Sequence, residues 1–131
     1  MSRRVVVTGL GTVNPLGNTV AEFWQNTARG VSGIGRITRF DAGPFPCRIA
    51  AEVKGFDPHR YIDAKDARRM DNFALYLVAS SVQAMQDAGI KNGDMPPERL
   101  GVVIGCGIGG LETLEAPVSY THLTLPTILR V

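Results

Sequence analysis

The sequence lacks the features that would place it in a membrane, outside the cell or on a nucleic acid. No apolar run approaches the ~18 residues that a membrane span needs. Only residues 5–7 follow the basic start as an apolar stretch, where a secretory signal needs ~7–15. Its two cysteines, Cys47 and Cys106, form neither a metal-type pair nor a disulfide framework. A net charge of +2 is too small to indicate a nucleic-acid partner. These absences favour a reduced, cytoplasmic protein.

The 131 residues suffice for one domain, which would bury roughly two-thirds of the surface that the unfolded chain exposes. Strands are predicted over residues 3–8 and 101–105, because the uninterrupted apolar stretches within them are typical of a sheet that is covered on both faces. Helical spacing of apolar side chains predicts helices over residues 20–29 and 64–88, and partial alternation predicts a short strand over 47–53. Strands that alternate with helices indicate an α/β fold with a right-handed, mostly parallel sheet covered by helices.

Capping residues predict where both helices begin and end. Thr19 and Glu22 have the spacing of a capping box at the start of the first helix, and Gly30 follows its end. Asp63 is the expected N-cap of the second helix. We predict this helix to be one continuous element of about 37 Å that ends at Gly89. Glycines and prolines predict a loop over residues 31–46.

Gly9 and Gly11 follow the first predicted strand, as glycines do in dinucleotide-binding turns. The third glycine of the G-x-G-x-x-G pattern would fall at position 14, which is Asn14, and Pro15 follows it. No acidic residue closes a second strand about 20 residues further on. We therefore favour the alternative, in which the glycines allow a turn and close packing of strand on helix. No cofactor is predicted.

Cys106 ends the second apolar run, where open α/β sheets carry reactive groups. The G-x-nucleophile-x-G elbow needs a glycine at position 104, which is Ile104. His59 lies in a predicted loop and His122 lies near the end of the sequence, so that no base is placed beside the thiol. We favour a buried, unreactive thiol over a nucleophile.

A basic cluster lies at the start of the second predicted helix. Its cations Lys65, Arg68 and Arg69 lie in the first turns, and His59 and Arg60 lie just upstream. Cations in the first turns of a helix oppose its dipole, and the acidic Asp87 lies in the last turn, where it opposes the dipole too. Helix stability therefore does not explain the placement. Two interpretations stay open: a surface that binds an acidic partner, or an ordinary solvated face.

Six short motifs punctuate the sequence. They are residues 5–17, Phe23-Trp24, Arg39-Phe40-Asp41, Arg69-Met70-Asp71, Asp87-Ala88-Gly89 and residues 107–110. Together they resemble the β-ketoacyl-acyl-carrier-protein synthases, condensing enzymes of the thiolase-like fold. The resemblance covers residues 3–114. It is strongest for the chain-elongating type II class, with the type I class and polyketide ketosynthases close behind. It implies the N-terminal part of a thiolase-like fold, with an incomplete, mostly parallel sheet covered by helices.

The resemblance implies an acyltransferase of fatty acid biosynthesis. In that family an acyl group passes from a carrier protein to a cysteine, which divides one difficult step into two. Malonyl-carrier protein then loses carbon dioxide, and the resulting carbanion attacks the thioester in a decarboxylative Claisen condensation. Two histidines and donor amides stabilise the developing charge. The family's cysteine motif, histidines and lysine have no counterpart in residues 1–131. We therefore assign no catalytic residue and expect this chain alone to be inactive.

The resemblance also implies two binding surfaces. Gly107 and Ile108 lie beside the acyl pocket in that family, where one branched side chain sets the depth of the pocket. The alternative is that Ile108 packs in the core. Lys65, Arg68 and Arg69 stand where the family meets its acidic carrier protein. The implied partners are acyl- and malonyl-loaded acyl carrier protein and, in the full-length family, a second copy of the enzyme, with no cofactor and no metal.

The end of the sequence departs from the family pattern. We expect residues 1–117 to form a truncated N-terminal synthase domain and residues 118–131 to be a non-homologous tail, which resembles a translated sequencing adapter. A second class of function stays open: a non-catalytic module that binds acyl chains or a carrier protein through the same residues. Two parallel strands with two helices cannot complete a doubly covered sheet, which argues against this module.

Overall fold

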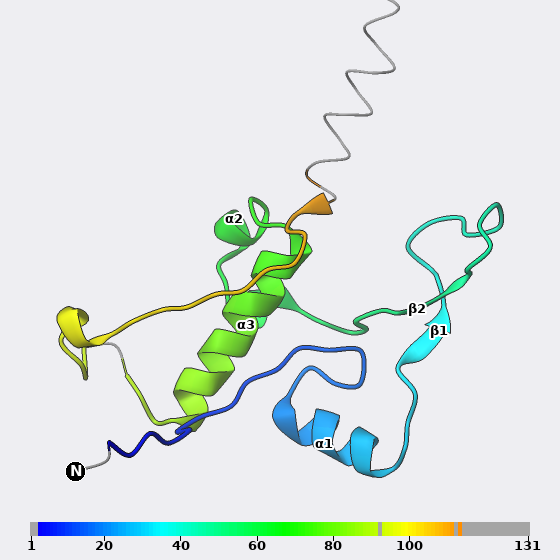
Figure 1. Ribbon diagram of the computed structural model, residues 1–131. Helices are drawn as coiled ribbons and strands as arrows, with labels where there is room; N and C mark the ends of the chain where they lie inside the picture. Colours follow the sequence, from blue (N-terminus) through cyan, green and yellow to red (C-terminus); the bar gives the residue numbers. More distant parts are fainter. Residues whose placement is uncertain (1–2, 92, 112, 114–131) are drawn as a thin grey trace, which may run out of the picture.

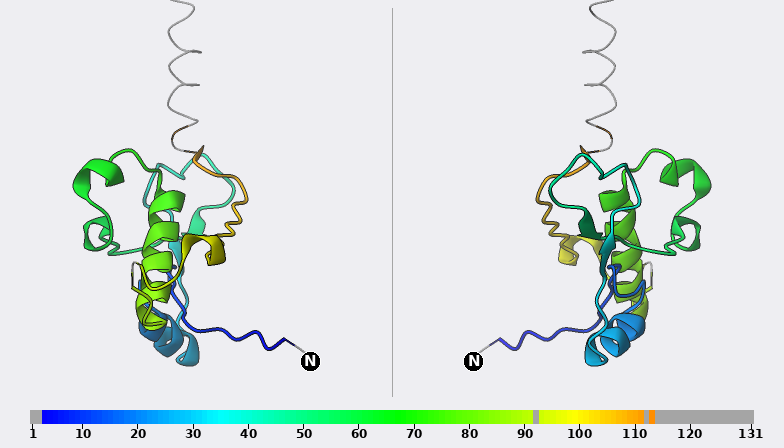
Figure 2. Two further views of the ribbon diagram at one scale, coloured as in Figure 1. Left: turned by 90° about the vertical axis from the view of Figure 1, so that its left-hand side faces the viewer. Right: turned by 90° about the vertical axis from the view of Figure 1, so that its right-hand side faces the viewer.

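The structure is a computed structural model that describes residues 3–91, 93–111 and 113. Its elements, in chain order, are α1 (Val20–Ala28), β1 (Ile34–Arg36), β2 (Ile49–Ala51), the 3-10 helix η1 (Pro58–Arg60), α2 (Ala64–Ala67), α3 (Asn72–Asp87) and the 3-10 helix η2 (Pro97–Arg99). Helix α3 lies at the centre of these elements (Figure 1). The β1–β2 hairpin and η2 lie on opposite sides of it, and α1 lies toward its C-terminal end (Figures 1 and 2).

Helix α1 confirms the helix that was predicted over residues 20–29, and it ends one residue earlier. The Thr19 hydroxyl accepts a hydrogen bond from the Glu22 amide at 3.2 Å, which satisfies one of the free amides of the first turn. The Glu22 carboxylate accepts from the amide of Asn18 at 2.8 Å, one residue before the position that a capping box uses. Local capping therefore defines the start of this helix.

Strands β1 and β2 form a two-stranded antiparallel sheet, in which Ile34 pairs with Ala51 and Arg36 with Ile49. Strand β2 lies within the strand predicted over residues 47–53, but β1 lies within the predicted loop over 31–46. The loop prediction was wrong there because a three-residue strand that follows Gly33 and contains Gly35 carries too little alternation to be recognised.

The single helix predicted over residues 64–88 is also wrong, because the structure divides it into α2 and α3. Helix α3 begins at a new N-cap, Asp71, whose Oδ1 accepts a hydrogen bond from the amide of Asn72 at 2.6 Å. Lys65 and Arg68 consequently lie in the last turn and at the C-cap of α2, not at the start of a long helix. These two cations therefore do not oppose the dipole of a long helix.

The two predicted buried strands, over residues 3–8 and 101–105, have no ladder partner among the described residues. Val5 and Val103 are 93% and 99% exposed. In the described part of the chain, the buried apolar side chains are Ala42, Ala67, Leu75 and Ala79. The parallel pairing of the two apolar runs remains a prediction. None of the described helices combines the length and apolarity needed to cross a membrane.

The N-terminal glycines lie directly on helix α3. A Cβ atom added to Gly11 would lie 2.8 Å from the amide nitrogen of Ala84, and one added to Gly9 would lie 2.7 Å from that of Ala88. The amide of Leu10 donates to Asp87 Oδ2 at 2.9 Å. This geometry supports the packing interpretation of the two glycines, because only a residue without a Cβ can approach a helix backbone so closely.

Candidate functional site

The glycine-rich segment, which we define as residues 104–113, faces helix α3 across a cavity of about 320 Å³. The lining residues are Phe73, Tyr76, Leu77, Ser80, Ile104, Gly105, Cys106 and Gly107. One wall is a largely apolar face of α3, and the other is formed by residues 104–107. The side chains of this lining are mostly apolar, which suits an apolar ligand or chain.

The structure separates the two residues that were predicted beside an acyl pocket. Gly107 lines the cavity, whereas Ile108 is not among its lining residues and is 78% exposed. The alternative, in which Ile108 packs in a core, is therefore not realised in the described part of the chain. Its role in a pocket wall remains a prediction.

Asp71 joins the start of α3 to the end of the glycine-rich segment. Its Oδ1 caps α3 through Asn72, and its Oδ2 accepts two hydrogen bonds from Thr113, from the amide at 3.2 Å and from the hydroxyl at 3.0 Å. Partial burial raises the pKa of the Asp71 carboxyl. The hydrogen bonds from Thr113 and Asn72 and the charge of Arg39 together lower this pKa by a larger amount. The net pKa lies below the ordinary value, so that this carboxyl is an ionised acceptor at neutral pH. We did not predict this contact, and the only local signal for it is an aspartate at a helix start.

Arg39 and Glu52 connect the hairpin to the same end of α3. Glu52 accepts hydrogen bonds from the hydroxyl of Thr38 at 2.7 Å, from its amide at 3.0 Å and from the amide of Arg39 at 3.3 Å. The Arg39 Nη2 donates to the hydroxyl of Tyr76 at 3.2 Å. Tyr76 lines the cavity of the glycine-rich segment and also a larger one, of about 530 Å³, between the hairpin and α3.

Cys106 is exposed, which corrects the prediction of a buried thiol. The reason is that the strand expected to carry it into a sheet has no ladder partner among the described residues. In that part of the chain the thiol makes no hydrogen bond, and His59 lies in η1. His122 lies outside the described residues. Within residues 3–91, 93–111 and 113, the structure therefore assembles no pair of nucleophile and base at Cys106.

Lys65, Arg68 and Arg69 are all exposed and lie in or directly after α2. Helix α2 contacts η1, which carries His59 and Arg60, so that the five residues of the predicted basic cluster lie in or next to two neighbouring elements. Lys65, Arg68 and Arg69 form no ion pair with any described residue. The acidic Asp63 and Asp66 lie in the same segment, and the surface is therefore of mixed charge with two adjacent arginines at its end.

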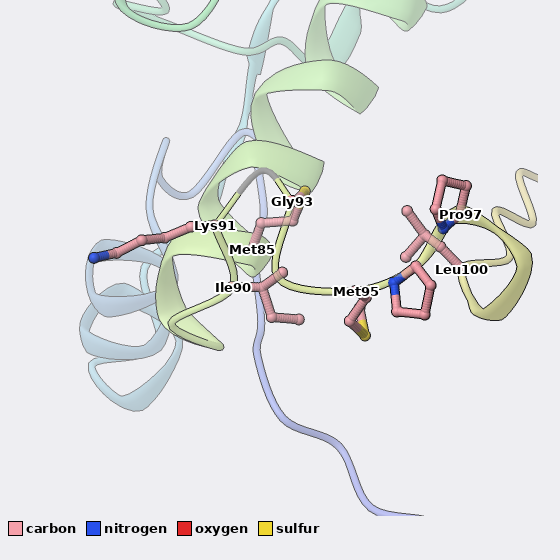
Figure 3. A pocket seen from close by; sticks show the side chains of 8 residues that line it. Met85, Ile90, Lys91, Gly93, Met95, Pro97 and Leu100 are labelled. Atoms are coloured by element: carbon pink, nitrogen blue, oxygen red, sulfur yellow. The ribbon is translucent and has the colours of Figure 1, made fainter.

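A further cavity, of about 330 Å³, lies at the C-terminal end of α3 (Figure 3). Met85, Ile90, Met95 and Leu100 contribute apolar side chains to it, and the side chain of Lys91 extends away from these residues. It contains none of the predicted site residues. No group of three or more potential metal ligands exists among the residues that the structure describes.

Comparison with known proteins gives one family and several relatives. The family described as β-ketoacyl synthase, N-terminal domain, matches residues 2–126. The chain is 49% identical over 113 residues to 3-oxoacyl-[acyl-carrier-protein] synthase 2 of Synechocystis sp., covering 86% of this chain and 27% of the relative. It is 45% identical over 114 residues to the protein of the same name from Staphylococcus aureus, covering 87% and 28%. The chain thus spans little more than a quarter of the length of these curated relatives.

Two solved structures are similar to the fold. The ishigamide ketosynthase/chain length factor superposes with a TM-score of 0.75 at 29% identity, over 95% of this chain and 31% of that one. The complex AntDE:AntF is described as a type II PKS acyl-carrier protein with its ketosynthase bound to the hexaketide. It superposes with a TM-score of 0.74 at 24% identity, over 94% of this chain and 33% of that one.

Proposed function

Because the chain belongs to the β-ketoacyl synthase family, we propose that it supplies the N-terminal region of a 3-oxoacyl-[acyl-carrier-protein] synthase. The observation that carries this proposal is the 45–49% identity to relatives of that name over most of the chain. The reaction of the whole protein would be the decarboxylative condensation of malonyl-carrier protein with an acyl-enzyme thioester. The catalytic cysteine, histidines and lysine of that reaction would come from outside this segment.

The segment would contribute part of the wall of the acyl pocket. The cavity between α3 and the glycine-rich segment supports this role, since it is lined mainly by apolar side chains and includes Gly107. Ile108, exposed at the adjacent position, would meet the acyl chain once the remainder of the pocket is in place. A branched side chain there would limit the length of chain that the pocket accepts.

The segment would also contribute to the docking of acyl carrier protein. Lys65, Arg68 and Arg69 are exposed and carry no ion pair among the described residues, so that they are available to an acidic partner. The AntDE ketosynthase is itself in complex with an acyl-carrier protein. Charges at the rim of an interface mainly steer association and set the register of the two proteins.

The exposed apolar runs around Val5 and Val103 support a larger sheet in the whole protein. Apolar β-branched side chains are costly to leave in water, and unpaired backbone N–H and C=O groups offer an edge on which further strands can pair. We place both runs in the mostly parallel, helix-covered sheet of a thiolase-like fold. Dimerisation of the whole protein belongs to the same proposal.

A polyketide ketosynthase is the second candidate, because one structural neighbour is described as the ketosynthase of a type II PKS and the other as a ketosynthase/chain length factor. The identities of 29% and 24% to these structures are well below the 45–49% to the curated fatty acid relatives. We therefore favour fatty acid elongation.

A chimera tests the proposal. In this chimera, residues 3–113 replace the matching segment of the Synechocystis relative. We expect it to condense malonyl-carrier protein with acyl-carrier protein primers, and the 131-residue chain alone to show no such condensation. A folded chimera without activity would contradict the proposed function, and turnover by the chain alone would contradict the placement of the catalytic groups outside it.

A further inference from the structure

We infer that Asp71 is a positioning residue. Its carboxylate holds residues 107–113 of the glycine-rich segment against the start of α3, and this contact sets the position of Ile108. This inference rests on the proposed function for its consequence, since Ile108 is taken as part of an acyl-pocket wall. The clamp itself is a property of the described residues.

The two oxygens of the carboxylate bind different parts of the chain. Oδ1 accepts from the amide of Asn72 and caps α3, whereas Oδ2 accepts from both the amide and the hydroxyl of Thr113, 42 positions further along. Between described residues, the two bonds from Thr113 are the only hydrogen bonds that join residues 101–113 to the rest of the chain. Loss of Oδ2 as an acceptor would therefore remove both of these bonds.

Gly110 is matched to this arrangement. A Cβ atom added to Gly110 would lie 2.6 Å from Asp71 Oδ2 and 3.2 Å from Asp71 Cγ, closer than packed atoms tolerate. Any side chain at position 110 would have to displace the carboxylate. The glycine thus admits the clamp, and the amide of Leu111, which donates to the carbonyl oxygen of Gly109 at 3.2 Å, closes the turn beside it.

The clamp lies next to the cavity that the segment shares with α3. Phe73 and Tyr76 follow Asp71 by one half-turn and by little more than one turn of helix, and both line that cavity together with Gly107. Arg39 donates to the hydroxyl of Tyr76 and its charge favours the ionised form of Asp71. The carboxylate therefore sets the distance between the two walls at the end of the cavity that Gly107 lines, directly before Ile108.

A simple helix cap would make different demands on the sequence. An asparagine at position 71 keeps an oxygen that can cap α3, and Thr113 has no part in capping. The clamp instead requires a doubly accepting oxygen at position 71 and a hydroxyl at position 113. Asp71→Asn, Thr113→Val and Thr113→Ser separate the two roles, and Asp63→Asn is a matched control because Asp63 occupies the N-cap of α2 without a side-chain hydrogen bond.

The experiment uses the chimera with two measurements. The first is amide hydrogen exchange of residues 107–113. We expect exchange to accelerate about threefold to tenfold in Asp71→Asn and Thr113→Val, the range that the loss of one or two ordinary hydrogen bonds gives. Exchange in Thr113→Ser and Asp63→Asn should match the parent. Unchanged exchange in Thr113→Val would overturn the clamp whether or not the chimera is active.

The second measurement is kcat/KM for acyl-carrier protein primers of short and long acyl chain. We expect the ratio of kcat/KM between the two primers to change severalfold in Asp71→Asn and Thr113→Val. In Thr113→Ser, which keeps the hydroxyl, this ratio should match the parent. A loss of stability alone would lower both values equally and leave the ratio unchanged. Altered exchange with an unaltered primer ratio would overturn the positioning of Ile108, and an inactive parent would contradict the proposed function while the exchange result still decides on the clamp.

Discussion

At the scale of single residues, the absence of side chains decides where the chain can approach helix α3. Gly9 and Gly11 lie against the backbone at Ala88 and Ala84, and the amide of Thr12 donates to Gln83 Oε1 at 3.2 Å. The pattern of two glycines after an apolar run is compatible with phosphate binding and with packing. The contact with α3 favours packing, because the face that a ligand would need is occupied by a helix.

Gly11→Ala should destabilise the chimera. The new methyl group would lie 2.8 Å from the nitrogen of Ala84 and could be accepted only by moving the segment or the helix. Overpacking of this kind costs about 1–3 kcal/mol, which urea denaturation would measure as a lower unfolding midpoint. Gly35→Ala is the matched control, since its Cβ would meet only the flexible end of Lys54, at 3.8 Å. Equal midpoints for the two variants would refute close packing at Gly11.

At the scale of elements, local hydrogen bonds determine which segments are helical and where they stop. The Thr19 cap was evident in the sequence, and α1 begins where it predicts. The Asp71 cap was missed, because Met70 shares the helical spacing of the apolar residues that follow it and gave no reason to interrupt the helix. The interruption moves the cations of α2 away from the position on which the dipole argument depended.

The hairpin offers a prediction about pH. The hydroxyl of Thr38 is the largest cause of the lowered pKa of Glu52, with smaller contributions from the amides of Thr38 and Arg39. The pKa of Glu52 is lower in the folded state than in the unfolded state. Glu52 therefore stabilises the hairpin at a pH above its unfolded pKa, and this contribution is lost as the pH falls through the folded pKa. Thr38→Val should therefore raise the pKa of Glu52, as measured by carboxyl-carbon NMR titration.

The control for this titration is Thr27→Val. The hydroxyl of Thr27 donates to the carbonyl oxygen of Phe23 within α1, away from the hairpin. Its removal should leave the titration of Glu52 unchanged. If Thr38→Val also leaves the titration where it was, the hydroxyl is not the group that stabilises the carboxylate.

At the scale of the whole molecule, the described residues bury few side chains and expose two short apolar runs. Three of the four buried apolar side chains are alanines, whereas Val5 and Val103 are almost fully exposed. A sheet covered on both faces needs more strands and helices than this segment contains. This agrees with a chain that spans little more than a quarter of its curated relatives.

Docking to a carrier protein is tested at this scale. Arg68→Glu combined with Arg69→Glu in the chimera should slow association with acyl carrier protein about tenfold at low ionic strength, because steering by a few charges contributes factors of this order. The difference should shrink as salt is added, since screening weakens interactions between exposed charges. Stopped-flow fluorescence would measure the rate, and Arg29→Glu, at the C-cap of α1, is the charge-reversal control. An unchanged rate at low salt would remove Arg68 and Arg69 from the docking surface.

By itself, the amino-acid sequence determined the family, the helix α1 and the position of β2, because motifs and caps depend on residues only a few positions apart. The tertiary structure decided the pairing of β1 with β2, the division of the long helix, the exposure of Cys106 and the contacts of Asp71 and Gly11. The Asp71–Thr113 bonds span 42 positions and the Thr12–Gln83 bond spans 71. Such contacts exist only after the chain has folded back on itself, and no local pattern of side chains specifies which distant groups will meet.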